Sequence, residues 1–178
     1  MAKGQRELVA VAAIPILAAT ILLLPPWAFL GVLGGAVAIA CDELLIMARS
    51  AGFKVSRGPQ IIAVAVLVAA SWEFGITGTV VAATAAVVMV PTLRIASEQA
   101  PIGSLGGIAV ELFAILYLGL TASCLGWLRL WPAEPLGVKL LIFYLVCIWV
   151  GDSGAYYVGR TFGRHKMSPR ISPNKTFE

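Results

Sequence analysis

The sequence predicts an all-α fold, a polytopic integral membrane bundle with about six transmembrane helices. Of the 178 residues, 60% are hydrophobic and only 12% are charged, and the mean hydropathy is +0.92. A soluble domain carries about 25% charged residues, so this chain has too few polar side chains to cover a water-facing surface. The apolar residues also occur in runs of roughly 15 to 20, close to the length of one bilayer crossing. These observations exclude a soluble globular domain, a disordered chain and a secreted disulfide scaffold.

The first three apolar segments lie in the N-terminal part of the chain. Residues 8–24 form the first segment, and Pro25 and Pro26 end it. A second apolar run, residues 27–48, begins at once, which argues against a cleaved signal peptide. The third segment, residues 60–72, is the shortest of the set.

The last three apolar segments lead to a polar tail. Residues 76–90 form the fourth segment, which we expect to end before Pro91. Residues 105–128 and 136–158 form the fifth and sixth. We therefore expect a transmembrane helical bundle over residues 1–158, followed by a cytoplasmic basic loop over residues 159–178.

The placement of the basic residues predicts the orientation of these segments. With a cytoplasmic N-terminus, only Arg129 and Lys139 fall on the outer side of the membrane. Eleven cations then fall on the cytoplasmic side: Lys3, Arg6, Arg49, Lys54, Arg57, Arg94, Arg160, Arg164, Lys166, Arg170 and Lys175. A split of 11 against 2 follows the positive-inside rule, so we expect both termini to be cytoplasmic. Because this rule accounts for the net charge of +4, we expect no nucleic-acid partner.

Acidic residues inside the apolar runs are candidates for function, because a carboxylate in a bilayer is costly and usually faces a polar cavity. Asp42 and Glu43 lie near the end of the second segment, where an interfacial position explains them equally well. Glu111 lies in the fifth segment, near the expected inner edge of the membrane. Asp152 lies in the sixth segment.

Asp152 is distinguished by the residues that follow it. Asp152, Tyr156 and Arg160 are spaced four residues apart, so a continuous helix would place them in one polar stripe. Five cations lie between residues 160 and 175. Such a set suits phosphate groups and a divalent metal, but it also suits an anchor that binds anionic lipid headgroups. Composition alone leaves these two interpretations open.

Two adjoining stretches closely resemble the bacterial phosphatidate cytidylyltransferases, also called CDP-diglyceride synthetases. The first stretch is GDSGAYYVGR, residues 151–160, followed by GRHK at 163–166; the second is SPNKTFE, residues 172–178. The resemblance implies an inner-membrane enzyme that transfers CMP from CTP to phosphatidic acid, giving CDP-diacylglycerol and pyrophosphate and requiring Mg²⁺. Both substrates are polyanions, so a site built from positioned cations is physically reasonable.

On this resemblance we expect Asp152 and Lys175 to be catalytic residues and Asp152 to be a metal ligand. The expected substrate-binding residues are Tyr156, Arg160, Ser172, Asn174 and Thr176. Pro173 disfavours helical geometry at Ser172, which allows the chain to turn back toward the membrane. The expected partners are CTP, phosphatidic acid and membrane lipids, with a homodimer as an open alternative.

The family carries a further C-terminal signature whose aspartates are expected to be the principal metal ligands, and this chain ends at Glu178 before it. We therefore expect residues 1–178 alone to insert into a membrane without turning over substrate, and a missing segment or partner chain to supply the remainder. The alternatives are a transporter or lipid-binding scaffold for anionic phospholipids, or cytidylyl transfer to another lipid phosphate. A transporter would be expected to show repeated halves or paired broken helices, which the sequence does not show.

Overall fold

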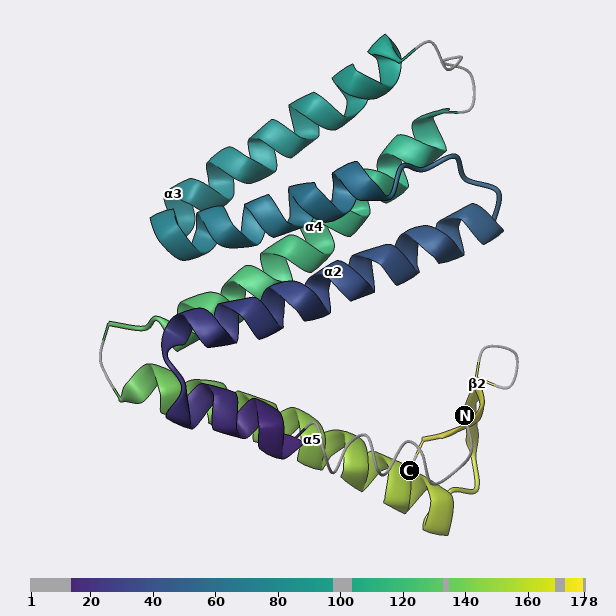
Figure 1. Ribbon diagram of the computed structural model, residues 1–178. Coiled ribbons are helices and arrows are strands. Elements are labelled where there is room, and N and C mark those ends of the chain that lie inside the picture. Colours follow the sequence, from purple (N-terminus) through teal and green to yellow (C-terminus); the bar gives the residue numbers. More distant parts are fainter. Residues whose placement is uncertain (1–13, 98–103, 133–134, 169–171, 178) are drawn as a thin grey trace. The chain divides into compact units, whose positions relative to one another are not determined.

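The computed structural model describes residues 14–97, 104–132, 135–168 and 172–177. A short helix, Ile14–Leu23, comes first. The remaining elements are helices α2 (Pro26–Ser50), α3 (Gly58–Ala96), α4 (Ser104–Arg129) and α5 (Leu136–Phe162), then strands β1 (Lys166–Ser168) and β2 (Ser172–Thr176). The predicted all-α membrane fold is confirmed, with one small β-hairpin added to it (Figure 1).

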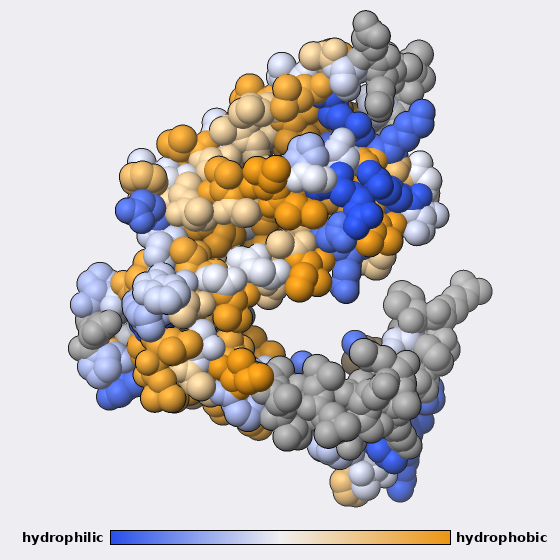
Figure 2. Space-filling view, viewed as in Figure 1, coloured by the Kyte–Doolittle hydropathy of each residue, from blue (hydrophilic) through white to orange (hydrophobic). Residues whose placement is uncertain are grey.

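Helices α2 to α5 are each long and apolar enough to cross a membrane. The shortest of the four, α2, has 25 residues and rises about 37 Å, against a hydrocarbon core of about 30 Å. Much of the outer surface of the helices is apolar, as the orange flanks in Figure 2 show. The chain is therefore a multi-pass membrane protein.

Helix α3 is a hairpin of two helical arms. Its 39 residues would rise about 58 Å if straight, which is nearly twice the thickness of the hydrocarbon core. The backbone leaves helical geometry at Gly75, where φ is 58° and ψ is −139°, and Figure 1 shows the two arms turning back on each other there. Only glycine adopts such a conformation without strain. The arms, residues 58–74 and 76–96, correspond to the third and fourth predicted segments.

The predicted end of the fourth segment before Pro91 is wrong, because Pro91 lies inside α3. Proline removes one backbone N–H from the helix. The Thr92 hydroxyl donates a hydrogen bond to the neighbouring Val88 carbonyl at 2.7 Å.

Helix α4 packs against both α2 and α3. Small residues at positions 106 and 107 allow this close approach. A Cβ atom added at Gly106 would meet the Phe53 ring at 2.9 Å, and one added at Gly107 would meet the Lys54 carbonyl oxygen at 2.2 Å. At Gly34 in α2, by contrast, an added Cβ would meet no described atom within 4 Å.

The chain divides into two compact units, residues 1–138 and 139–178. In the second unit α5 continues to Phe162, four residues beyond its predicted end. Where the sequence predicts a polar loop, β1 and β2 pair in antiparallel fashion, with Lys166 opposite Thr176 and Ser168 opposite Ser172. The hairpin closes with the Phe177 amide donating to the His165 carbonyl at 3.0 Å.

Candidate functional site

The C-terminal half of α5 carries the predicted polar stripe. Because the helix is continuous to Phe162, Asp152, Tyr156 and Arg160 lie on successive turns of one face. Arg160 Nη1 donates a hydrogen bond to the Tyr156 hydroxyl at 3.3 Å, and all three side chains are exposed. Tyr156 is further oriented by Tyr157, whose ring lies edge-on to it with centroids 5.3 Å apart. Asp152 makes no hydrogen bond or ion pair with another residue in the described ranges.

Strand β2 brings a second set of predicted residues to the end of α5. Thr176 Oγ1 lies 3.1 Å from the position of a Cβ at Gly159 and 2.6 Å from one at Gly163, so both glycines leave room for the threonine. Thr176 Oγ1 is buried there, without a hydrogen-bond partner among the residues described. Lys175, the preceding residue, is exposed. We call Asp152, Tyr156, Arg160, Lys175 and Thr176 the helix–hairpin site.

Two further predicted residues lie on the same strand. Ser172 is partly buried and stands opposite Ser168 in the hairpin. Asn174 belongs to β2, but its side chain lies outside the described part of the structure.

The helix–hairpin site does not by itself fit a resident magnesium ion. Mg²⁺ takes octahedral oxygen coordination and is commonly held by one or two carboxylates together with substrate phosphates. Asp152 is the only carboxylate of the site, and the described ranges hold no group of three or more His, Cys, Asp or Glu residues suited to a metal. Further ligands would have to come from a substrate or from residues that the structure does not describe.

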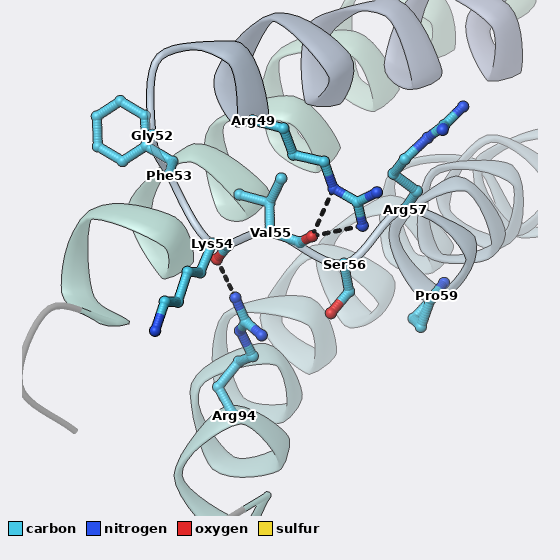
Figure 3. Close-up of a pocket in the computed structure, with 9 residues that line it drawn as sticks. All are labelled: Arg49, Gly52, Phe53, Lys54, Val55, Ser56, Arg57, Pro59 and Arg94. Carbon is cyan, nitrogen blue, oxygen red and sulfur yellow. Dashed lines mark hydrogen bonds between the residues drawn. The ribbon is translucent and has the colours of Figure 1, made fainter. Parts of the chain in front are cut away.

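A second polar site, which the sequence did not predict, lies in the first unit, where residues 51–57 connect α2 to α3. Arg49, in the last turn of α2, donates two hydrogen bonds to the Val55 carbonyl, from Nε at 3.1 Å and from Nη2 at 2.8 Å. Arg94, near the end of α3, donates to the Lys54 carbonyl. Figure 3 shows the two arginines reaching the connection from different helices.

Glu111, in α4, holds the 51–57 connection in place. Its carboxylate is fully buried, and Oε1 accepts a hydrogen bond from the Ser56 amide at 2.6 Å. Oε1 also lies 3.4 Å from Arg94 Nη2, whose side chain is 13% exposed. The cost of burying this acid in α4 is thus offset by a cation and a backbone donor. Glu111 is a positioning residue for the connection.

Asp42 has a comparable role at the start of α3. It accepts two hydrogen bonds from Arg57, at 2.6 Å from Nε and 2.5 Å from Nη2. Glu43, the neighbouring acid, is exposed. The interfacial interpretation of the Asp42 and Glu43 pair stays a prediction.

Beside these contacts lies an open pocket of about 660 Å³, which we call the cationic pocket. Its lining residues are Arg49, Gly52, Phe53, Lys54, Val55, Ser56, Arg57, Pro59 and Arg94 (Figure 3). Figure 2 shows hydrophilic side chains gathered over this end of α2 and α3. Two features of the sequence could have indicated this pocket. One is the acid Glu111 inside an apolar segment, and the other is the assignment of the four lining cations to the same side of the membrane.

Comparison with known proteins identifies the family. The sequence model of the cytidylyltransferase family matches residues 4–178. The chain belongs to the cytidylyltransferase family. The resemblance carried by the GDSGAYYVGR and SPNKTFE stretches is thereby confirmed.

Relatives of this cytidylyltransferase-family chain carry a common name. A protein of Pseudomonas aeruginosa named phosphatidate cytidylyltransferase is 30% identical over 179 residues, covering 98% of this chain and 64% of the relative. A Staphylococcus saprophyticus protein of the same name is 39% identical over 67 residues, covering 38% of this chain and 24% of the relative. A Haemophilus influenzae protein of that name is 45% identical over 42 residues, or 24% of this chain and 15% of the relative. The chain therefore spans less than two thirds of each of these relatives. No solved structure matches it.

Proposed function

We propose that this chain is the membrane-embedded part of an enzyme that transfers CMP from CTP to phosphatidic acid. A phosphate oxygen of phosphatidic acid would attack the α-phosphorus of CTP, forming CDP-diacylglycerol as pyrophosphate leaves. The family match over residues 4–178 carries this proposal, together with the name shared by its relatives. Cytidylyl transfer to another lipid phosphate is the neighbouring alternative.

The helix–hairpin site supplies groups suited to this reaction. Arg160 and Lys175 are exposed cations on elements that meet at the end of α5, where they can neutralise phosphate charge. Tyr156 orients Arg160 through their hydrogen bond. Thr176 fixes the hairpin against Gly159 in α5 and Gly163 just after it, and thereby positions Lys175.

Magnesium is part of the proposal only as an ion shared with the substrate. Asp152 would supply one oxygen ligand, and the phosphates of CTP would supply others. Ser172 and Asn174 are proposed to shape the strand that presents Lys175. A homodimer and a separate C-terminal segment stay predictions, which crosslinking in membranes would decide.

The test uses a chimera in which this chain replaces the matched region of the Pseudomonas aeruginosa relative. Membranes containing the chimera should convert radiolabelled CTP and phosphatidic acid to CDP-diacylglycerol, whereas residues 1–178 alone should not. Asp152→Asn should lower turnover at least about a hundredfold, comparable to removing one strong electrostatic contributor. Glu73→Gln, at an exposed carboxylate of α3, is the matched control and should leave turnover unchanged. Normal turnover in Asp152→Asn, with the same Mg²⁺ dependence, would refute its assigned role.

We further propose a cytoplasmic-membrane location with both termini in the cytoplasm. In support, the cationic pocket gathers four cations that the charge split assigns to the cytoplasmic side. Reporter fusions after Ser50, Glu98 and Glu178 should give a cytoplasmic signal, and a fusion after Pro132 an external one. An external signal after Glu178 would remove the helix–hairpin site from the CTP pool and contradict the proposal.

A further inference from the structure

We propose that the outer face of the β1–β2 hairpin, formed by Met167, Lys175 and Phe177, lies in the headgroup layer of the bilayer. The two apolar side chains of this face insert among the lipids. The partner is an anionic lipid surface, not a substrate bound in a pocket. All residues involved belong to the second unit, residues 139–178. The inference requires that α5 crosses the membrane, but it does not depend on the proposed cytidylyl transfer.

The hairpin has two faces, because successive side chains of a strand point to opposite sides. Thr176 marks the inner face, since its Oγ1 lies 3.1 Å from the position of a Cβ at Gly159 of α5. This contact is with the flank of the helix. Lys175 and Phe177, the neighbours of Thr176, therefore point away from α5.

Met167 belongs to the same outer face. Lys166 stands directly opposite Thr176 in the hairpin, and opposed residues of an antiparallel pair share a face. Met167 follows Lys166 and so points the other way. In agreement with this assignment, Met167 is 50% exposed and Phe177 is 70% exposed. Two apolar side chains thus accompany Lys175 on an exposed face.

The place of the hairpin along α5 puts this face at the edge of the membrane. Lys139 marks the other end of the hydrocarbon-spanning part of α5, because an ammonium group is costly in hydrocarbon. About 20 helical residues cross a hydrocarbon core of about 30 Å, and counting 20 residues from Lys139 leads to Gly159. Thr176 packs at this residue, and Figure 1 shows the hairpin at the end of α5. The hairpin therefore lies at the boundary between hydrocarbon and headgroups.

The charge of the hairpin segment favours anionic lipids as the partner of the outer face. Residues 160–175 contain five cations and no acidic residue. Basic segments beside a membrane-spanning helix attract anionic headgroups, and apolar side chains among the cations insert below them. Lys175 then lies at the level of the lipid phosphates, with Phe177 anchoring the strand two residues later.

The experiment measures the depth of the hairpin rather than turnover. In the 178-residue chain the three native cysteines are replaced by alanine, and a nitroxide label is attached to a new cysteine, Met167→Cys or Phe177→Cys. The protein is placed in nanodiscs of phosphatidylglycerol, without CTP or phosphatidic acid. Collisions of the label with oxygen, which concentrates in lipid, are compared with collisions with a water-soluble nickel chelate. We expect both labels to collide more with oxygen.

Removal of one inserted side chain should release the hairpin. With the label at position 167, Phe177→Ser should lower the ratio of inserted to free hairpin at least about tenfold, the lower bound for burying a phenylalanine side chain. Phe143→Ser is the matched control, because it removes the same side chain from a 67% exposed position near the other end of α5. Equal effects of the two substitutions would contradict insertion of Phe177.

A second measurement uses the chain with no substitution. Trypsin cleavage after Lys166 should be at least about tenfold slower in phosphatidylglycerol nanodiscs than in phosphatidylcholine nanodiscs, because several cations bind the anionic surface. Equal cleavage rates would overturn the preference for anionic lipid. Labels at 167 and 177 that collide mainly with the nickel chelate would overturn the insertion. Labels shielded from both reagents would show that protein, not lipid, covers this face. None of these outcomes bears on turnover in the chimera, so the two proposals can fail separately.

Discussion

Substitution of Gly107 by alanine tests whether the 51–57 connection is held as tightly as its contacts indicate. A Cβ at this position would lie 2.2 Å from the Lys54 carbonyl oxygen, and Cβ atoms essentially never approach other heavy atoms closer than 3.0 Å. The carbonyl would therefore have to move by about 0.8 Å, the difference between these two distances. The same carbonyl accepts a hydrogen bond from Arg94, and the Ser56 amide two residues later donates to Glu111. A shift of this size weakens both bonds.

The expected cost follows from these two bonds. A hydrogen bond to a charged group contributes about 1.5–3 kcal/mol, and alanine recovers about 1 kcal/mol over glycine inside a helix. We expect Gly107→Ala to lower the free energy of unfolding by about 2–3 kcal/mol. For a chain of this length that corresponds to a thermal midpoint lower by about 4–12 °C.

The assay is thermal unfolding of the purified chain in detergent, followed by tryptophan fluorescence. Gly34→Ala in α2 is the matched control, because an added Cβ meets no described atom within 4 Å. Its midpoint should stay the same or rise slightly. If Gly107→Ala unfolds at the same temperature as Gly34→Ala, the 51–57 connection moves without losing its hydrogen bonds. Arg94 and Glu111 then do not hold it tightly.

Three further predictions concern other parts of the chain. Asp42→Asn breaks the two-fold contact with Arg57, but both side chains are about one third exposed, so the loss in unfolding free energy should be at most about 1 kcal/mol. Gly75→Ala forces alanine into φ 58° and ψ −139° and should cost about 1–3 kcal/mol in the same unfolding assay; an unchanged midpoint would contradict the strained turn. In the chimera, Lys175→Ala should lower turnover at least about tenfold, as expected for one charged contact to phosphate. Arg170→Ala should instead mainly weaken the salt-sensitive attraction of the chain to anionic lipids. Equal, small effects of the last two substitutions would favour a diffuse lipid anchor.

Much of the fold could be predicted from hydropathy because each helix is a continuous apolar run. The predicted ends fell short where the last helical turn carries polar residues: α2 continues past Ala48 through Arg49, and α5 continues past Val158 through Arg160. A segment predicted from hydropathy ends at such polar residues, although the helical backbone hydrogen bonds continue through them. The break predicted between residues 72 and 76 contains the turn at Gly75.

The two sites differed in how far the sequence could predict them. The helix–hairpin stripe is local, since Asp152 and Arg160 are related by the helical repeat alone. The cationic pocket is not local, because Glu111 contacts Ser56 across 55 positions and Arg94 comes from the far arm of α3. No spacing rule connects these residues, so only the packing of three helices shows that they meet.

The hairpin form of α3 has a consequence for the surrounding lipid. With both arms crossing the bilayer, as the charge split predicts, the first arm, residues 58–74, rises about 25 Å, roughly 5 Å less than an average hydrocarbon layer. Such hydrophobic mismatch is relieved by local thinning, at a cost of fractions of a kcal/mol per Å. The neighbouring helix α2 is long enough to span the full thickness. The lipid annulus around the first unit is therefore expected to be uneven, and bilayers of shorter acyl chains should accommodate this protein with less deformation than thick ones.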